Sequence, residues 1–365
     1  MHFYESSIIT TKDGLHCQVY ANEHPVNSIL VKPKYIPTDK IESSALQYRF
    51  IAGRKMNRLN LWADKEALKN YIEDFKQKYP HYILPHNKLF FSIPIDQIER
   101  VYFPRTGLKE LMAMPVVALD EHLKNVHSFV SFLAQSGVKA SDLGITYSTL
   151  MGHYNSQVSD INIVVYGKQN FWNLMKYLET AQHSSLRWKT ESDWLEYYTK
   201  RNRFAVFGKD SFLKSSMRKK SEGYFNNTLF VIFAAEKEEE VHTKWGTEKV
   251  EDCGVATVEG TVIDDFHSVV RPGYYGVDTR AHTKENTKEN NSIDGNDGKD
   301  IPVSSIVFYS RDYCMLVQKG EKIQACGNLE RVTTTDGRVH YRVVVGYFDS
   351  YLDDRREKEF VRLVE

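Results

Sequence analysis

The residues best suited to chemistry lie in one segment, GITYSTLMGHYNSQVSDINIVVYG, which covers residues 144–167. Ser148 is expected at a turn into a short helix, where unpaired backbone N–H groups and a hydroxyl suit a phosphate. Asp160 opens an apolar strand, and alternate strand residues face one side, so Asp160 and Asn162 should share a face. Oxygen ligands at this spacing predict a site for Mg²⁺ or Mn²⁺ that bridges the phosphates of a nucleotide.

This segment resembles the active-site region of the DNA polymerase beta superfamily of nucleotidyltransferases, in which a Gly-Ser turn precedes an Asp-x-Asp strand. More narrowly, the chain is similar to a family of archaeal predicted nucleotidyltransferases. The pattern of that family, GSxxxGxxNxxxSDIDLVVYG, is matched here at Ser148, Gly152, Asn155, Ser159, Asp160, Tyr166 and Gly167. The resemblance covers most of the chain, and its specific part is this one segment.

The resemblance implies transfer of a nucleotidyl group from a nucleoside triphosphate to an unknown acceptor. Asp160 and Asn162 would be the catalytic residues and would hold Mg²⁺. The nucleotide would be bound by Ser148, together with Tyr147 and Gly152.

Two further residues are assigned to the predicted site with an alternative for each. Lys168, just past the strand, is predicted to contact phosphate, or else to be an ordinary surface lysine. The superfamily usually takes another carboxylate from a later strand. Glu236, at the end of TLFVIFAAE, is the candidate third metal ligand, and its alternative is a solvated side chain at a strand end.

Two departures from the family pattern bear on activity. Tyr147 places a bulky side chain where a glycine backbone would approach phosphate. Asn162 replaces the second aspartate, and its neutral amide offsets less of the charge of a divalent cation. The alternative function is therefore a catalytically inactive scaffold that retains the fold and binds a nucleotide or a nucleic acid.

Two other regions suggest a nucleic-acid partner. The stretch KSSMRKKSEGYFNN carries Lys214, Arg218, Lys219 and Lys220, which are predicted to contact RNA or DNA, or alternatively to form a solvated helix face. The C-terminal strands could form a small barrel of the kind that binds oligonucleotides. Its stacking candidates, which could equally be core residues, are Phe308, Tyr309, Arg311 and Tyr313.

The surrounding elements predict an α+β protein with a polymerase-beta-like core, a mixed sheet with helices. This core, residues 116–248, should lie between an α/β N-terminal region at 1–115 and a β-rich C-terminal domain at 249–365. The core should contain a helix over LDEHLKNVHSFVSFLAQSG, whose apolar residues recur at helical spacing. Asp336-Gly337 suits the turn of a β-hairpin. Residues 280–300, rich in polar and turn-forming residues, should be a flexible insertion.

Composition limits the remaining possibilities. The 365 residues carry 48 Lys plus Arg and 48 Asp plus Glu, so no global charge draws the chain to nucleic acid or to an anionic membrane. Four cysteines without a CxxC pair disfavour a zinc knuckle, and reduced, mostly buried thiols are expected. The polar N-terminal segment lacks a signal-peptide core and no apolar run could span a bilayer, which predicts a cytoplasmic protein without membrane contact.

Overall fold

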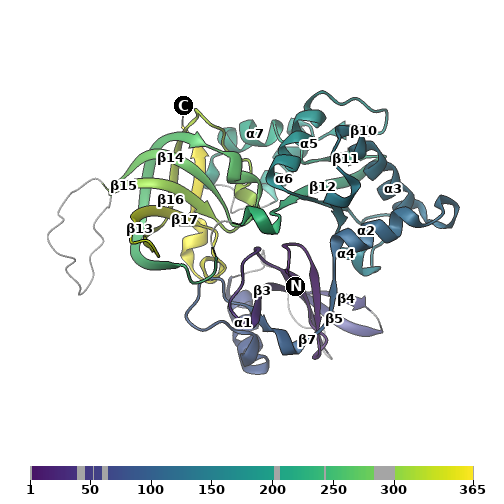
Figure 1. Cartoon of the computed structure of the whole chain (residues 1–365), viewed down its shortest axis with the longest axis horizontal. Coiled ribbons are helices and arrows are strands. Elements are labelled where there is room, and N and C mark those ends of the chain that lie inside the picture. Colours follow the sequence, from purple (N-terminus) through teal and green to yellow (C-terminus); the bar gives the residue numbers. More distant parts are fainter. Residues whose placement is uncertain are drawn as a thin grey trace. The chain divides into compact units, whose positions relative to one another are not determined.

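The computed structural model describes residues 2–38, 46–51, 53–59, 65–200, 206–241, 244–282 and 301–364. The chain forms two compact units (Figure 1). The first comprises Met1–Asp193 and Arg218–Lys244, and the second Trp194–Met217 and Trp245–Glu365. The mixture of helices and sheets confirms the predicted α+β class. Of the insertion predicted at 280–300, all but the first three residues lie outside the described part of the chain.

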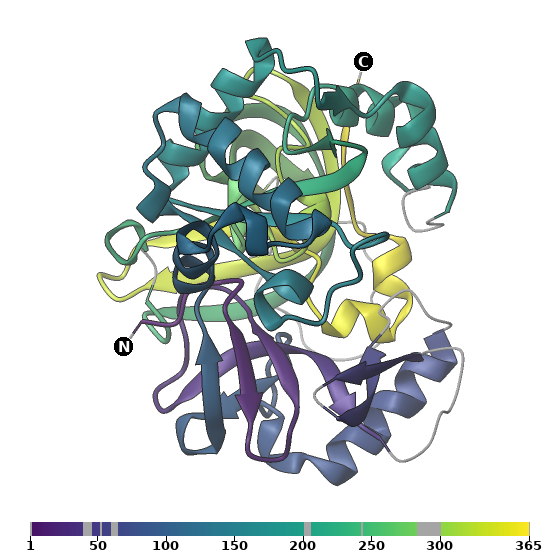
Figure 2. The ribbon, with the colours of Figure 1, turned by 90° about the vertical axis from the view of Figure 1, so that its right-hand side faces the viewer.

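The first unit begins with an antiparallel sheet in the order β4-β5-β3-β2-β1-β7, and β6 pairs with β3. The strands are β1 (Ile8–Thr11), β2 (His16–Val19), β3 (Ser28–Pro37), β4 (Leu46–Ile51), β5 (Arg54–Leu59), β6 (Ser92–Pro94) and β7 (Ile98–Tyr102). Helix α1 (Lys65–Lys78) lies beside these strands (Figures 1 and 2) and buries Leu68, Ile72 and Phe75. The ring of Phe75 packs on that of Phe91 at 5.2 Å, and Phe91 directly precedes β6, so the helix covers the apolar start of this strand.

A second, mixed sheet of the first unit has the order β10-β11-β12-β9-β8. Its strands are β8 (Leu143–Ile145), β9 (Ile161–Tyr166), β10 (Leu186–Trp188), β11 (Glu222–Phe225) and β12 (Thr228–Ala235). Strands β9 and β12 are parallel, and every other pair in this sheet is antiparallel. A mixed sheet with helices was predicted for this region. Its assignment to the polymerase-beta superfamily stays a prediction.

Helices α2 (Pro104–Ala113), α3 (Glu121–Leu133), α4 (Tyr147–Met151) and α5 (Lys168–Thr180) belong to the same unit. The predicted helix α3 begins where the Asp120 side chain accepts a hydrogen bond from the backbone N–H of Leu123 at 2.9 Å, a standard N-cap. Its apolar stripe reaches the sheet, since the ring of Phe129 lies 4.5 Å from that of Phe230. The periodicity therefore located the helix and its buried face correctly.

The second unit contains a closed barrel. Strands β13 (Glu248–Asp264), β14 (Gly273–His282), β15 (Ile301–Phe308), β17 (Val339–Val345) and β16 (Lys322–Thr334) pair in this order, and β16 pairs again with β13. Strand β18 (Phe360–Leu363) adds to β16. The predicted hairpin is confirmed, because β16 and β17 are antiparallel and Gly337 has a φ of 84°. The unit also holds α7 (Lys209–Met217), while α6 (Glu191–Thr199) crosses the boundary at residue 193.

Two of the proposed stacking residues lie in the interior of the barrel. Phe308 is fully buried and Tyr313 is 6% exposed, and both belong to the apolar core of the barrel. Their rings cannot offer a face to a nucleic-acid base, so the core alternative holds for these two. Tyr309 stacks on Tyr347 with ring centroids 4.7 Å apart.

Two composition-based expectations can also be compared with the structure. All four cysteines are free thiols, but only Cys17 is fully buried and the other three are partly exposed. In the described ranges, no helix is long and apolar enough to cross a membrane.

Candidate functional site

Strand β9 brings the predicted turn and the predicted carboxylate together. All six of its residues are buried, because β8 and β12 flank it. Ile145 of β8 pairs with Ile163, and the backbone N–H of Thr146 donates to the carbonyl oxygen of Asn162 at 3.1 Å. The turn that starts at Tyr147 is therefore adjacent to the start of β9, which Asp160 directly precedes. A common pocket for Ser148 and Asp160 stays a prediction.

The other motif residues of this segment shape the connection between α4 and β9. Gly152 ends α4 with a φ of 72°, a left-handed conformation that glycine adopts readily. The backbone N–H of Asn155 donates to Oγ of Ser159 at 2.9 Å, and Oδ1 of Asn155 accepts from the N–H of Gln157 at 2.9 Å. These two hydrogen bonds close the loop and fix the point at which the chain enters β9, directly after Asp160. The predicted nucleotide contact of Gly152 stays a prediction.

Tyr147 adopts a left-handed backbone conformation, which glycine tolerates far better than other residues. Its φ is 57°, which is unfavourable for a bulky residue. The side chain packs edge-on against Phe233 at 5.8 Å, and the ammonium of Lys34 lies 3.5 Å from its ring centroid. Cation–π and ring packing hold this residue in place. The correspondence of this turn to the Gly-Ser turn of the family pattern stays a prediction.

Strain at Tyr147 can be measured by comparing two replacements. Tyr147→Gly and Tyr147→Ala both lose the ring contacts, but only alanine keeps the unfavourable φ. We expect the glycine variant to be more stable than the alanine variant by about 1 kcal/mol, measured by urea unfolding. Equal stabilities would show that the turn relaxes to a negative φ once the ring is gone.

Asp160 is a partly buried carboxylate that faces charges from the N-terminal sheet. Burial raises the pKa of its carboxyl, while the positive charges of Arg58 and Lys34 lower it and the charge of Glu222 raises it further. Lys34 lies on β3 and Arg58 on β5. The sequence predicted no site residue within residues 1–115, yet this region supplies both cations. Nothing in the local sequence around either residue marks this role.

Glu222 is an acidic residue of the site that the sequence analysis did not single out. Asn162 pairs with Val231 of β12, and Val231 pairs with Glu222 of β11. Directly paired residues share a face, so Asn162 and Glu222 lie on the same face, about 10 Å apart across two strand spacings. The Glu222 carboxylate is bound by the ammonium of Lys189 at 2.5 Å, and the Lys189 side chain is 7% exposed.

The side chains at this site do not fit the magnesium pair that the resemblance implies. Within the ranges that the structure describes, no three His, Cys, Asp or Glu side chains gather closely enough to hold a metal ion. Nδ2 of Asn162 donates to the backbone oxygen of Asp160 at 3.3 Å, and Lys189 already neutralises Glu222. A pair of divalent ions needs several anionic oxygens, and of the two described carboxylates at this site, Asp160 and Glu222, the second is already bound by Lys189.

Lys168 and Glu236 are brought together, but away from Asp160. The Lys168 ammonium binds the Glu236 carboxylate at 2.7 Å, and the two side chains are 4% and 9% exposed. Glu236 directly follows Ala235, which pairs with Tyr166 at the far end of β9. That end is about 13 Å from the Asn162 level at ordinary strand rise. Neither the solvated alternative for Glu236 nor the surface alternative for Lys168 describes this buried pair.

The predicted nucleic-acid stretch is divided between the two units. Lys214 is exposed on α7 of the second unit, whereas Arg218, Lys219 and Lys220 belong to the first. The Lys220 ammonium lies 4.9 Å from the ring centroid of Trp188, one residue before Lys189. The part of the stretch nearest to the candidate site is therefore the end that leads into β11.

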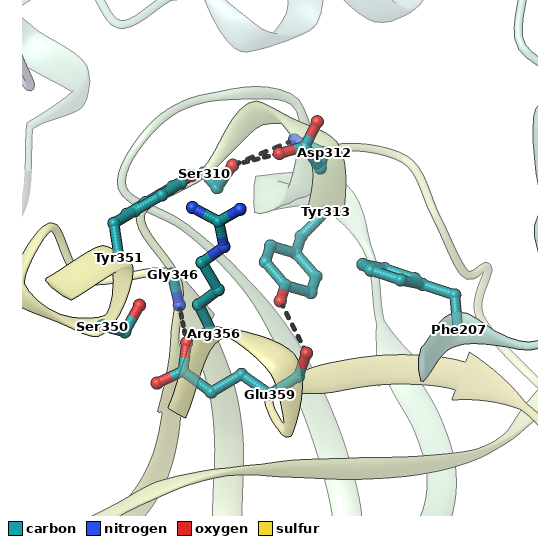
Figure 3. Close-up of a pocket in the computed structure, with 9 residues that line it drawn as sticks. All are labelled: Phe207, Ser310, Asp312, Tyr313, Gly346, Ser350, Tyr351, Arg356 and Glu359. Carbon is teal, nitrogen blue, oxygen red and sulfur yellow. Dashed lines mark hydrogen bonds between the residues drawn. The ribbon is translucent and has the colours of Figure 1, made fainter. Parts of the chain in front are cut away.

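A pocket in the second unit offers little unused chemistry (Figure 3). Its lining is Phe207, Ser310, Asp312, Tyr313, Gly346, Ser350, Tyr351, Arg356 and Glu359. The Glu359 carboxylate accepts hydrogen bonds from the N–H of Gly346 at 2.8 Å and from Nδ2 of Asn328 at 3.2 Å. Its backbone oxygen accepts from the Tyr313 hydroxyl at 3.2 Å. These bonds fasten β18 and the preceding segment to the barrel, which is a structural role.

Comparison with known proteins gives one relative and no function. The chain is 26% identical over 359 residues to an uncharacterized protein of Methanocaldococcus jannaschii, and the match covers 95% of this chain and 98% of that protein. No protein-family model matches the chain, and no solved structure matches it.

Proposed function

We propose that this chain is a nucleotidyltransferase-like protein that binds a nucleoside triphosphate where β9 begins. The observation that carries the proposal is the hydrogen bond from the N–H of Thr146 to the carbonyl of Asn162. It sets the Tyr147-Ser148 turn beside Asp160, the order and spacing in which the superfamily arranges its turn and carboxylate. Lys34 and Arg58 add positive charge on the side of the N-terminal sheet, which suits a triphosphate.

Binding of each of the four ribonucleoside triphosphates, with and without Mg²⁺, tests this proposal by calorimetry. We expect at least one of them to bind the wild-type protein. We expect Arg58→Gln to weaken that binding by about tenfold, since it removes a charge-assisted contact to phosphate. Asp96→Asn, which changes an exposed carboxylate on a 3₁₀ turn of the N-terminal region, is the matched surface control and should bind like wild type.

Failure of all four nucleotides to bind a folded wild-type protein would contradict the proposal. Equal affinity of wild type and Arg58→Gln would place the bound nucleotide elsewhere on the molecule.

A second candidate function is nucleotidyl transfer itself, and Asp160 is the observation that favours it. Asp160 directly precedes β9, and in this proposal its carboxylate accepts a proton from an attacking hydroxyl. Pyrophosphate release by the wild-type protein that disappears in Asp160→Ala would establish transfer. Nucleotide binding without pyrophosphate release, together with release by Asn162→Asp, would instead identify an inactive scaffold.

The acceptor of such a transfer would be RNA or DNA in this proposal. Lys219 and Lys220 precede β11, which carries Glu222, and Lys220 already lies over Trp188. A basic segment with an aromatic ring next to the site suits the backbone and bases of a single strand. The chemistry of this surface, rather than any comparison, supports the suggestion.

A further inference from the structure

We infer that His122 of α3 is a positioning residue for the Tyr147-Ser148 turn, and that a nucleotide binds beside this turn only while the His122 ring is uncharged. His122 acts through Thr149 of α4 and touches no ligand itself. This role deepens the proposed function and rests on it for the ligand, whereas the effect of His122 on the turn is measurable without one.

The turn lies between two residues that are each held by another element. On its β8 side, the backbone N–H of Thr146 donates to the carbonyl oxygen of Asn162 at 3.1 Å. On its α4 side, Oγ1 of Thr149 lies at hydrogen-bond distance, 2.9 Å, from Nε2 of His122. Because α4 has only five residues, its own helical hydrogen bonds contribute little to holding it in place. The position of Ser148 therefore depends on these outside contacts.

The chain just beyond α4 is held by the same turn of α3. The His122 ring stacks on that of Tyr154, two residues after Gly152 ends α4, with ring centroids 4.7 Å apart. The Tyr154 hydroxyl donates to Oδ2 of Asp120 at 2.6 Å, and Asp120 is the N-cap of α3. The start of α3 thus holds the middle of α4 through Thr149 and the chain beyond it through Tyr154.

The surroundings of His122 suit its neutral ring and disfavour its charged ring. His122 is 1% exposed, and its Nδ1 has no hydrogen-bond partner among the described residues. A neutral ring can present a lone pair at Nδ1, whereas a protonated ring must carry an N–H donor there, which costs free energy in a buried position without an acceptor. Burial accordingly lowers the pKa of His122, and the charge of Asp120 opposes this only in part.

The two titratable neighbours of His122 keep their charges near neutral pH. Burial and the hydrogen bond to Asp120 raise the pKa of Tyr154 to about 12. Burial alone would raise the pKa of Asp120, but hydrogen bonds from Leu123 and Tyr154 lower it, so the carboxylate stays ionised. As the pH falls below 6.5, the ordinary pKa of histidine, the unfolded chain takes up a proton more readily than the buried ring does. Acid therefore weakens the packing of α3 on α4.

Variants that lose the hydrogen bond test the positioning role by calorimetry with the four ribonucleoside triphosphates. At about pH 7.5, where the ring is neutral, we expect His122→Ala and Thr149→Val each to weaken nucleotide binding by about tenfold. His122→Gln keeps a polar group near the position of Nε2 and cannot titrate, so it should bind within about twofold of wild type. His127→Gln, which changes a partly exposed histidine of the same helix, is the matched control.

The pH dependence separates positioning from a purely structural role. The nucleotide itself titrates, but its contribution cancels when wild type and His122→Gln are compared at the same pH. We expect the ratio of wild-type to His122→Gln affinity to be constant above the pKa of His122 and to fall below it, by up to about tenfold per pH unit. Nuclear magnetic resonance of the His122 ring measures that pKa, and circular dichroism defines the pH range in which both proteins are folded.

Hydrogen exchange in residues 147–154, measured without ligand, reports on the turn itself. Thr149→Val should speed this exchange at neutral pH. In acid, wild type should exchange faster than His122→Gln at the same pH, because only the wild-type ring becomes charged.

Wild-type affinity in both His122→Ala and Thr149→Val would overturn the positioning role, and so would unchanged exchange in Thr149→Val. An affinity ratio that stays constant down to the pH of unfolding would overturn the requirement for an uncharged ring. Any of these results, obtained with a nucleotide bound, leaves the proposed function standing. Faster exchange in Thr149→Val, with no triphosphate bound by the wild-type protein, would contradict the proposed function and leave the effect of His122 on the turn standing.

Discussion

The Lys168→Met variant should lose about 3–5 kcal/mol of unfolding free energy, because it leaves the buried Glu236 carboxylate without its cation. The ammonium of Lys168 binds Glu236 at 2.7 Å and also donates to the backbone oxygen of Glu240 at 3.3 Å. At about 2–4 °C per kcal/mol for a unit of this size, the melting temperature should fall by about 6–20 °C. Differential scanning calorimetry measures this change.

Two further variants separate loss of the ion pair from loss of packing. In Lys168→Met with Glu236→Leu, both charges are gone, so most of the lost stability should return. Lys69→Met is the surface control. Lys69 binds Glu66 at 3.1 Å on an exposed helix face, and its loss should cost less than about 1 kcal/mol.

This prediction also decides between two roles for Lys168. If it is structural, a folded Lys168→Met protein at low temperature should bind nucleotide with wild-type affinity. If Lys168→Met kept the wild-type melting temperature but lost nucleotide affinity, the phosphate-binding role expected from the sequence would be supported instead.

Local sequence signals were sufficient for the elements that position the site. The apolar spacing in α3, the apolar run of β9 and the Asp-Gly turn between β16 and β17 predicted these elements at their observed places. Each of these depends on residues within one turn or one strand, where backbone preference and burial act together. The short helix was expected to follow Ser148, but α4 begins at Tyr147 and includes Ser148. The turn after β8 lies next to the start of β9 because β8 and β9 are consecutive strands of one antiparallel pair.

Partners from distant parts of the chain could not be found in this way. Glu222 lies in the same row of side chains as Asn162 because β11 and β9 both pair with β12. The register of these three strands is set by packing rather than by local sequence. The alternation around Glu222 in SEGYF indicates a strand. The neighbouring lysines instead led to the prediction of a nucleic-acid contact or a solvated helix face. Lys34 and Arg58 belong to another sheet altogether, and no local pattern connects them to Asp160.

Glu236 shows how a correct element can yield a misplaced site residue. The strand TLFVIFAAE was expected and is present as β12, with Glu236 directly after it. Because β12 runs parallel to β9, its C-terminal end lies beside Tyr166 instead of beside Asp160. Strand direction determines which end carries the chemistry, and direction depends on the connection through β10 and β11.

Loss of a buried ion-pair cluster in the barrel should cause the other large decrease in stability. The Arg342 guanidinium binds Glu330 at 3.0 Å and Glu248 at 3.0 Å, and the Glu330 side chain is 1% exposed. Burial alone disfavours the charge of Arg342, but Tyr309 and Glu330 act against it, and the net effect raises the pKa of the guanidinium. Arg342→Met should therefore lower the unfolding free energy by about 3–5 kcal/mol.

Arg338→Met is the matched control for this change. Arg338 lies in the turn of the same hairpin and binds Asp336 at 2.7 Å, but the two side chains are 80% and 54% exposed. Solvent screens such a pair, so its loss should cost less than about 1 kcal/mol. The two arginines thus differ mainly in burial, and the difference between the variants measures what burial contributes.

Hydrogen exchange followed by mass spectrometry shows which strands are destabilised by Arg342→Met and which by Lys168→Met. Arg342→Met should speed amide exchange in β16 and β17, because it removes a cation that binds the buried Glu330 carboxylate, which the Tyr347 hydroxyl also contacts at 2.9 Å. Lys168→Met should speed exchange in β9 and β12 instead. If Arg342→Met left exchange in β16 and β17 unchanged, the bonds of Arg342 to Glu330 and Glu248 would not be what stabilises these two strands.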